Sequence, residues 1–248
     1  RAPAYLGTGF LKSNLLDLSR YLRFLAAGDG AALGLPAGRL AELTRPRGWS
    51  QPGGSYALAW SVREHRGVTV VRHGGSLKGV SSSQGFVPEL GLGVAVLTNV
   101  DGAPALRAWH AAVNLALGDP ADRPLYGHGH EALSAHGEEG GAAEAMRRLA
   151  GMYSSGEPWG RLELRVERAA EGGEGEGGAS ELVAYAGEDL ERIGRVALLG
   201  GGLPAGPGTA EFVLVGEFGA WDGGRFHLDA SGRPYAVQHS TRWYDREG

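Results

Sequence analysis

The stretch that decides the fold covers residues 70–99 and reads VVRHGGSLKGVSSSQGFVPELGLGVAVLTN. Apolar and β-branched runs separated by short segments rich in Gly and Pro are typical of strands. Together with the residues before it, this pattern predicts strands over residues 55–64, 68–73, 81–87 and 91–99. The connections at 64–67 and 88–91 have hairpin length, so the strands that they join should be antiparallel neighbours.

Helices are expected on either side of these strands. Asn14 is a suitable N-cap with Asp17 three residues later, and Gly28 is a suitable helix end. Between them an apolar stripe recurs at a spacing of three and four residues, namely Leu15, Leu18, Leu22 and Leu25. A short helix is expected at 40–44, and a longer one should begin at Pro104 and run to 117. The predicted fold class is α+β, an antiparallel sheet flanked by helices.

The second half of the chain has another pattern. Residues 121–141 are rich in His, Gly and Glu without periodicity and read as a linker, followed by a short helix at 142–149. Turns at 222–224 and 230–232 then separate five or six short strands, which suggest a small all-β barrel. The strands are expected at 161–168, 181–186, 195–199, 211–218, 225–229 and 234–240. The predicted domains are residues 1–120, a linker with a short helix at 121–146, and a barrel at 147–248.

Composition excludes several classes of function. No window approaches the roughly 18 apolar residues of a spanning helix, and a net charge of −4 without a basic run argues against nucleic acid as a partner. The chain has no cysteine, which excludes disulfides and thiolate metal sites but leaves the compartment open. It begins at Arg1 with no readable targeting signal, so its localisation stays unknown. We expect it to be a piece of a longer protein.

The candidate chemistry lies at His73-Gly74-Gly75-Ser76. A side chain at the first position can point into a cleft, while two glycines let a substrate carbonyl lie against bare backbone. The strand pattern continues with Pro88-Glu89 and ends at Thr98-Asn99. Residues 70–99 thereby resemble the third motif of the serine beta-lactamase and penicillin-binding-protein superfamily, in its class C and esterase-like branch. In that family Lys-Thr-Gly or His-x-Gly stands at the end of one strand, and the next two strands end in Pro-Glu and Thr-Asn.

Flanking segments support the resemblance. Residues 56–60 are similar to the family's Tyr-x-x-Gly-Trp strand, with Ala59 where Gly is usual, and residues 9–22 are similar to the helix after its second motif. The first 118 residues thus resemble the C-terminal half of a catalytic domain. Residues 149–153, which open the strand-rich region, resemble the start of a lipocalin-like barrel appended to some members.

The resemblance implies roles for four residues. His73 would be an electrostatic or proton-relay group, and the backbone N–H of Ser76 would be one of two oxyanion-hole donors. Such a donor contributes about 10²–10³ in rate. Gly74, Gly75 and Ser76 would contact a small-molecule or peptide substrate. No cofactor and no metal are implied.

Two motifs of the family are absent from the chain. The only lysines are Lys12 and Lys78, and Gly9 and Gly75 stand three residues before them, so no Ser-x-x-Lys exists. None of the eight tyrosines is followed two residues later by Asn, as the family's second motif, Tyr-x-Asn, requires. Tyr153 and Ser155 resemble a Tyr-x-Ser variant of that motif, but they lie in the predicted barrel. The nucleophile and its base are therefore expected in a missing N-terminal half of the catalytic domain, and this chain alone is expected to be inactive.

Three hypotheses follow. The first is a fragment of a serine hydrolase whose parent cleaves an ester, a D-amino-acid peptide or a beta-lactam. The second is a pseudoenzyme or binding module, and the third is a barrel that binds a small ligand. Without the missing half, apolar surface should be exposed.

Some residues have a plainer interpretation. The histidines at 128, 130 and 136 read as a solvated linker rather than a metal cluster. Ser81, Ser82 and Ser83 should alternate across a strand, and one of them could line a cleft. Trp109, Phe212 and Phe218 are expected in cores, and residues 243–244 are expected as an exposed terminal patch.

Overall fold

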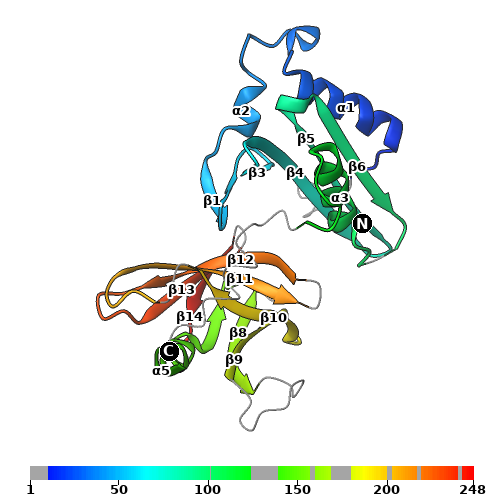
Figure 1. Cartoon of the computed structure of the whole chain (residues 1–248). Coiled ribbons are helices and arrows are strands. Elements are labelled where there is room, and N and C mark those ends of the chain that lie inside the picture. The colour runs from blue at the N-terminus through cyan, green and yellow to red at the C-terminus, as the bar shows by residue number, and fades with distance from the viewer. Residues whose placement is uncertain are drawn as a thin grey trace. The chain divides into compact units, whose positions relative to one another are not determined.

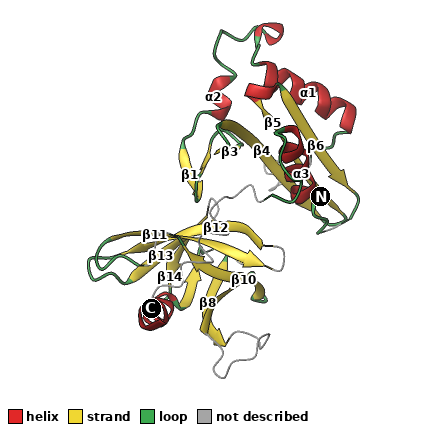
Figure 2. Ribbon diagram, viewed as in Figure 1, coloured by secondary structure: helices red, strands yellow, loops and turns green. Residues whose placement is uncertain are grey.

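The structure is a computed structural model of the chain, and it describes residues 11–100, 102–123, 139–156, 160–168, 180–199, 203–216, 219–239 and 242–248. The chain divides into two compact units, each described here by itself: residues 1–49 with 53–125, and residues 126–248 with 50–52. Figures 1 and 2 show a sheet with helices and a separate barrel. The predicted fold class, α+β followed by an all-β barrel, is confirmed. None of the described helices is long and apolar enough to cross a membrane.

The N-terminal unit is built on one antiparallel sheet in the order β1-β2-β3-β4-β5-β6. Its strands are β1 (Gly48–Gln51), β2 (Gly54–Tyr56), β3 (Ser61–His65), β4 (Val68–Leu77), β5 (Val80–Val87) and β6 (Leu92–Thr98). Its helices are α1 (Leu15–Ala27), α2 (Ala41–Thr44) and α3 (Ala105–Ala116), with short 3-10 turns η2 (Ala31–Leu33) and η3 (Pro88–Leu90). The sheet order follows the chain, as the short connections predict.

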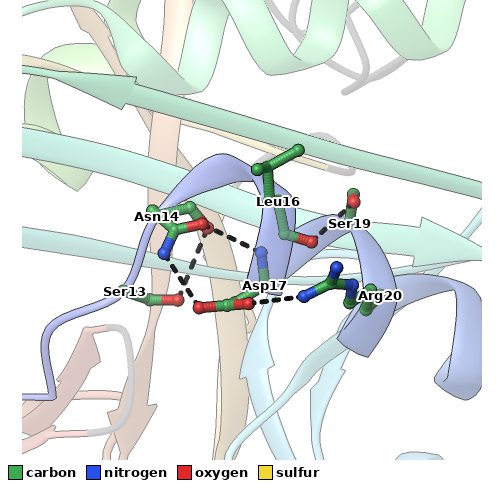
Figure 3. A network of polar contacts seen from close by, with 6 residues as sticks. All are labelled: Ser13, Asn14, Leu16, Asp17, Ser19 and Arg20. Carbon is green, nitrogen blue, oxygen red and sulfur yellow. Dashed lines mark hydrogen bonds and ion pairs between the residues drawn. The ribbon is translucent and has the colours of Figure 1, made fainter.

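Helix α1 begins as its sequence predicts. The side chain of Asn14 accepts a hydrogen bond from the backbone N–H of Asp17 at 3.0 Å and donates one to the Asp17 carboxylate at 2.8 Å. Asp17 also pairs with Arg20, as Figure 3 shows. Gly28 ends the helix in the left-handed conformation, with φ of 67°. The side chain of Asn14 thus satisfies one of the free backbone donors of the first turn.

Helices α1 and α3 cover opposite faces of the sheet. Val71 and Phe86 pack with Leu22 of α1, whereas their chain neighbours Val70 and Val87 pack with Trp109 of α3. Neighbouring residues of a strand point to opposite faces, so the two clusters lie on the two sides of β4 and β5. Figure 1 shows both helices against this part of the sheet. The prediction that Trp109 is a core residue is confirmed, since it is fully buried.

The glycine of β5 makes room for Trp109. A Cβ on Gly85 would lie 2.7 Å from the indole ring and 2.2 Å from the carbonyl oxygen of Val71. The indole Nε1 donates to the carbonyl of Val94 on β6 at 3.0 Å. A glycine is thus needed at 85 for the helix to pack this closely.

One predicted strand is divided in two. Residues 55–64 form β2 and β3 instead of one strand, because the chain turns between Ala57 and Trp60. Ala59 has φ of 63°, a conformation that a residue with a Cβ rarely adopts. β4, in contrast, is longer than predicted and continues through His73 to Leu77.

The second unit is a closed barrel of eight strands in the order β10-β11-β12-β13-β14-β7-β8-β9. The strands are β7 (Gly151–Ser154), β8 (Arg161–Arg168), β9 (Ser180–Ala186), β10 (Glu191–Leu198), β11 (Gly208–Gly216), β12 (Gly219–Leu228), β13 (Pro234–His239) and β14 (Arg242–Arg246), preceded by helix α5 (Glu139–Leu149). The prediction of five or six strands missed β7 and β14, both of which are only four or five residues long. The predicted boundaries at 120, 146 and 147 stay a prediction.

The interior of the barrel is packed with side chains. Tyr153, Phe212 and Phe226 are buried together, and the rings of Phe212 and Phe226 lie 4.8 Å apart. The predicted turn at 222–224 is wrong, because these residues lie within β12. A Cβ on Gly224 would lie 2.4 Å from the ring of Phe212. Gly224 therefore makes room for an aromatic ring and does not mark a turn.

The last strand closes the barrel and anchors helix α5. Arg246 donates to the carbonyl oxygens of Arg148 at 2.9 Å, Ala150 at 2.8 Å and Pro234 at 3.2 Å. The helix ends beside this guanidinium, and a cation there is favourable for its dipole. The expected exposed patch at 243–244 is only half correct, since Trp243 is exposed but Tyr244 is buried. Tyr244 belongs to the interior cluster of the barrel.

A group of basic side chains lies between α3 and the sheet. Burial lowers the pKa of His110 to about 3, and the positive charges of Arg72 and Arg63 act in the same direction. The pKa of His65, which is buried on β3, is also lowered by burial. The folded unit therefore holds His110 neutral at pH values where the unfolded chain binds a proton there.

We predict that Gly85→Ala lowers the free energy of unfolding by about 1–3 kcal/mol, because the new methyl group would overlap Trp109 and Val71. Urea unfolding measures the change. The matched control is Gly48→Ala in β1, where a Cβ would meet no atom within 4 Å. Equal stability of the two variants would contradict the packing described for α3.

We predict that His110→Gln makes the chain less sensitive to acid. Because the pKa of His110 is lowered from 6.5 to about 3 on folding, the unfolded state binds more protons between these values, so stability falls as the pH drops below about 6.5. The variant should lose less stability than the wild type between about pH 7 and pH 4.5. Urea unfolding at both pH values measures this, and an identical loss in the two proteins would contradict it.

Candidate active-site edge

The candidate site is the half of β4 that is paired on one edge only. Pairing between β3 and β4 ends at Ser61 opposite Arg72, whereas pairing between β4 and β5 continues to Leu77 opposite Val80. Among the described residues, no strand pairs with residues 73–77 of β4 on the β3 side. We call these five residues the open edge.

The turn between β2 and β3 sets the residue at which β3 begins, Ser61. The backbone N–H of Ala57 donates to the carbonyl of Trp60 at 2.8 Å, which closes a turn around Ala59. Trp60 is buried and packs edge-on against Phe86 with ring centroids 5.6 Å apart. The turn is thereby fixed to the core, and it carries Tyr56 at the end of β2.

The backbone N–H of Ser76 faces the open edge. Opposite it on β5, the N–H and the C=O of Ser81 bond the hydroxyl of Thr98 on β6, at 3.2 and 2.9 Å. In an antiparallel pair, opposite residues exchange either both hydrogen bonds or none. Ser81 therefore exchanges none with Ser76, whose own N–H and C=O point away from β5. An N–H in this position is available to an acceptor outside the sheet.

The two glycines leave the backbone beside this N–H uncovered. Gly74 and Gly75 are both exposed, and they pair with Ser83 and Ser82 of β5. The hydroxyl of Ser82 donates to the carbonyl of Gly75 at 3.3 Å and would lie 2.8 Å from a Cβ at that position. The predicted alternation of the three serines is present, because Ser81 and Ser83 are buried and Ser82 is less so. Ser82 shares a face of the sheet with Gly75.

The imidazole of His73 is held by two contacts. Its Nδ1 lies 2.6 Å from the carbonyl oxygen of Gly74, and its Nε2 lies 3.0 Å from the Tyr56 hydroxyl. The ring is exposed, and the Tyr56 ring meets it edge-on with centroids 6.3 Å apart. Tyr56 was not among the predicted site residues. The sequence did contain a signal for it, because Tyr56 is the first residue of the segment 56–60 that is similar to the family's Tyr-x-x-Gly-Trp strand.

The face of the sheet that carries His73 also carries exposed apolar side chains. Strand register places Leu77, Val80 and Leu97 on this face, and their side chains are 52%, 44% and 41% exposed. Exposed apolar surface was expected from the sequence, and these three side chains form part of such a surface.

The other predicted residues lie elsewhere. The histidines at 128, 130 and 136 and the aromatic residue at 218 lie outside the described residues. Within the described ranges, no group of three or more His, Cys, Asp or Glu side chains is placed to hold a metal ion. Phe212, predicted as a core residue, is buried in the barrel.

The family of this segment is shown by comparison with known proteins. Residues 1–117 match the Beta-lactamase family model, and this range contains the whole open edge and Tyr56. The segment is therefore part of a beta-lactamase domain, and the resemblance predicted from residues 70–99 is confirmed. No curated protein matches the chain.

Solved structures that are similar to the chain include the following three. They are SurE with D-Leu (18% identity, TM-score 0.50, 94% of this chain and 49% of that chain) and SurE (18%, 0.50, 94% and 48%). The third is the octameric penicillin-binding protein homologue from Pyrococcus abyssi (16%, 0.42, 94% and 46%). This chain spans about half the length of each. The likeness to SurE concerns the fold.

We predict that the amide proton of Ser76 exchanges with solvent faster than those of Gly75 and Leu77. Its N–H faces the open edge, whereas the neighbouring N–H groups alternate toward β5. Amide hydrogen exchange followed by NMR measures this directly. Equal protection of the three amides would contradict the assigned register.

Proposed function

We propose that this chain is part of a beta-lactamase-related serine hydrolase that reacts through an acyl-serine intermediate. The observation that carries the proposal is the Ser76 N–H, directed to the open edge beside His73 in a segment of this family. A backbone donor fixed in this way can stabilise the negative charge of a tetrahedral intermediate. His73 would be the adjacent electrostatic or proton-relay group, and Gly74 and Gly75 would leave room for the substrate.

The nucleophile and its base would come from a missing N-terminal half of the catalytic domain, outside these 248 residues. The 248 residues contain neither Ser-x-x-Lys nor Tyr-x-Asn, and they span about half the length of the similar solved structures. The exposed apolar residues on the face that carries His73 agree with a covering part of the catalytic domain. The chain alone would then be inactive.

The substrate class includes esters, D-amino-acid peptides and beta-lactams. One similar structure is that of SurE with D-Leu, which supports a D-amino-acid residue as a candidate. All three classes contain a carbonyl group whose oxygen could accept a hydrogen bond from the Ser76 N–H as negative charge develops on it.

The absence of both motifs also keeps a non-catalytic binding module as the second candidate. A longer protein that lacks Ser-x-x-Lys would favour it. A ligand site inside the barrel has less support, because the described interior is filled by aromatic and aliphatic side chains of the barrel itself.

We predict that the 248-residue chain is not labelled by a fluorescent penicillin and does not hydrolyse chromogenic short-chain esters or a D-leucine anilide. The longer protein that includes the upstream sequence should be labelled or should turn over at least one of them. In that protein, His73→Ala should lower kcat/KM by about 10² or more, as expected for a proton-transfer group.

The matched control for this experiment is Lys78→Ala, in the turn that follows β4. It changes an exposed side chain of the same hairpin and should leave kcat/KM within a factor of two or so of the unmodified protein. Covalent labelling of the 248-residue chain would overturn the proposal, as would a longer protein that has both motifs but reacts with none of the probes.

A further inference from the structure

Both ring nitrogens of His73 are occupied by protein groups. A carbonyl oxygen can only accept, so Nδ1, which lies 2.6 Å from the Gly74 oxygen, must carry the proton of that hydrogen bond. A neutral imidazole has one N–H, and Nε2 is then an acceptor. The group within reach of Nε2 is the Tyr56 hydroxyl at 3.0 Å, which must donate.

We propose that Tyr56 is a positioning residue that holds His73 in the Nδ1–H tautomer, with Nε2 as the acceptor. The role assigned to His73 rests on the proposed function, but the tautomer does not. Tyr56 reaches the ring from β2, the strand that leads into the turn around Ala59. The strand before this turn thus carries the phenol that orients the histidine.

The surroundings of Tyr56 suit it as a donor. Its backbone is fixed on both sides, since its C=O accepts from the N–H of Arg47 at 3.0 Å and it pairs with Ser61 on β3. The side chain is half-buried, and burial raises the pKa of its phenol, so the hydroxyl keeps its proton at neutral pH. A fixed, protonated phenol is a reliable hydrogen-bond donor to Nε2.

This arrangement determines what His73 can do with a proton. The proton would be taken up at Nε2, since Nδ1 already carries one, and the imidazolium would then donate from both nitrogens. The Tyr56 hydroxyl would rotate and accept from Nε2, because a phenol oxygen can do either. The ring would keep its place in both charge states, so the imidazolium could form at the open edge without movement of heavy atoms.

The experiment is a long-range ¹H–¹⁵N NMR spectrum of the uniformly ¹⁵N-labelled 248-residue chain at about pH 8.5, where ordinary imidazoles are neutral. The expected result is an unprotonated Nε2 and a protonated Nδ1 for His73. In Tyr56→Phe, which removes only the hydroxyl, the Nε2 resonance should move toward the position of a protonated nitrogen. Tyr21→Phe removes a hydroxyl from α1 of the same unit and should leave the His73 resonances unchanged.

A wild-type His73 that carries its proton mainly on Nε2 would overturn the proposal. So would a folded Tyr56→Phe variant with unchanged His73 nitrogens. If Tyr56→Phe does not fold, the tautomer of His73 measured in the wild-type chain is enough to support or overturn the proposal. Labelling or turnover does not enter this measurement, so a failure of the proposed hydrolase function and a failure of the tautomer assignment can be told apart.

Discussion

The candidate site depends on the point at which one strand stops pairing with its neighbour. The ladder between β3 and β4 ends at Ser61 opposite Arg72, although β4 continues for five more residues. Unpaired backbone groups at a sheet edge bind other groups readily, and proteins usually shorten, charge or cover such edges. Here no described strand pairs with the edge, which carries two glycines and a histidine. The turn around Ala59 produces this edge, and the buried ring of Trp60 holds the turn in place.

The fold was predictable where local chemistry and long-range packing agree. Asn14 caps helix α1 because its side chain accepts a hydrogen bond from the free N–H of Asp17, three residues later. This bond is local, so an Asn before an apolar helical stripe predicts it from sequence alone. The segment from His73 to Ser76 was placed by its resemblance to a family, and the family is confirmed for residues 1–117. The contact with Tyr56 was not predictable, because it joins residues 17 positions apart through a turn in which Ala stands at a position that favours Gly.

Glycine caused the clearest wrong prediction. At 222–224 two adjacent glycines suggested a turn, but both lie within a strand of the barrel, and Gly224 lies beside the ring of Phe212. Gly85 has the same role in the other unit, where it lies under Trp109. Both positions show that a glycine can serve the packing of a distant aromatic side chain. A single sequence does not distinguish this use from a turn, because the aromatic partner is far away along the chain.

The seam of the barrel joins β7 and β14, so Tyr153 lies opposite Arg246 although more than ninety residues separate them. Loop closure over such a distance carries an entropic cost that must be met before the contact gains anything, so this pairing is expected late in folding. Arg246 is also the residue that bonds the end of α5. Helix α5 is therefore secured by a side chain that lies 98 positions further along the chain, and it gains this bond only when the two ends of the barrel sequence have met.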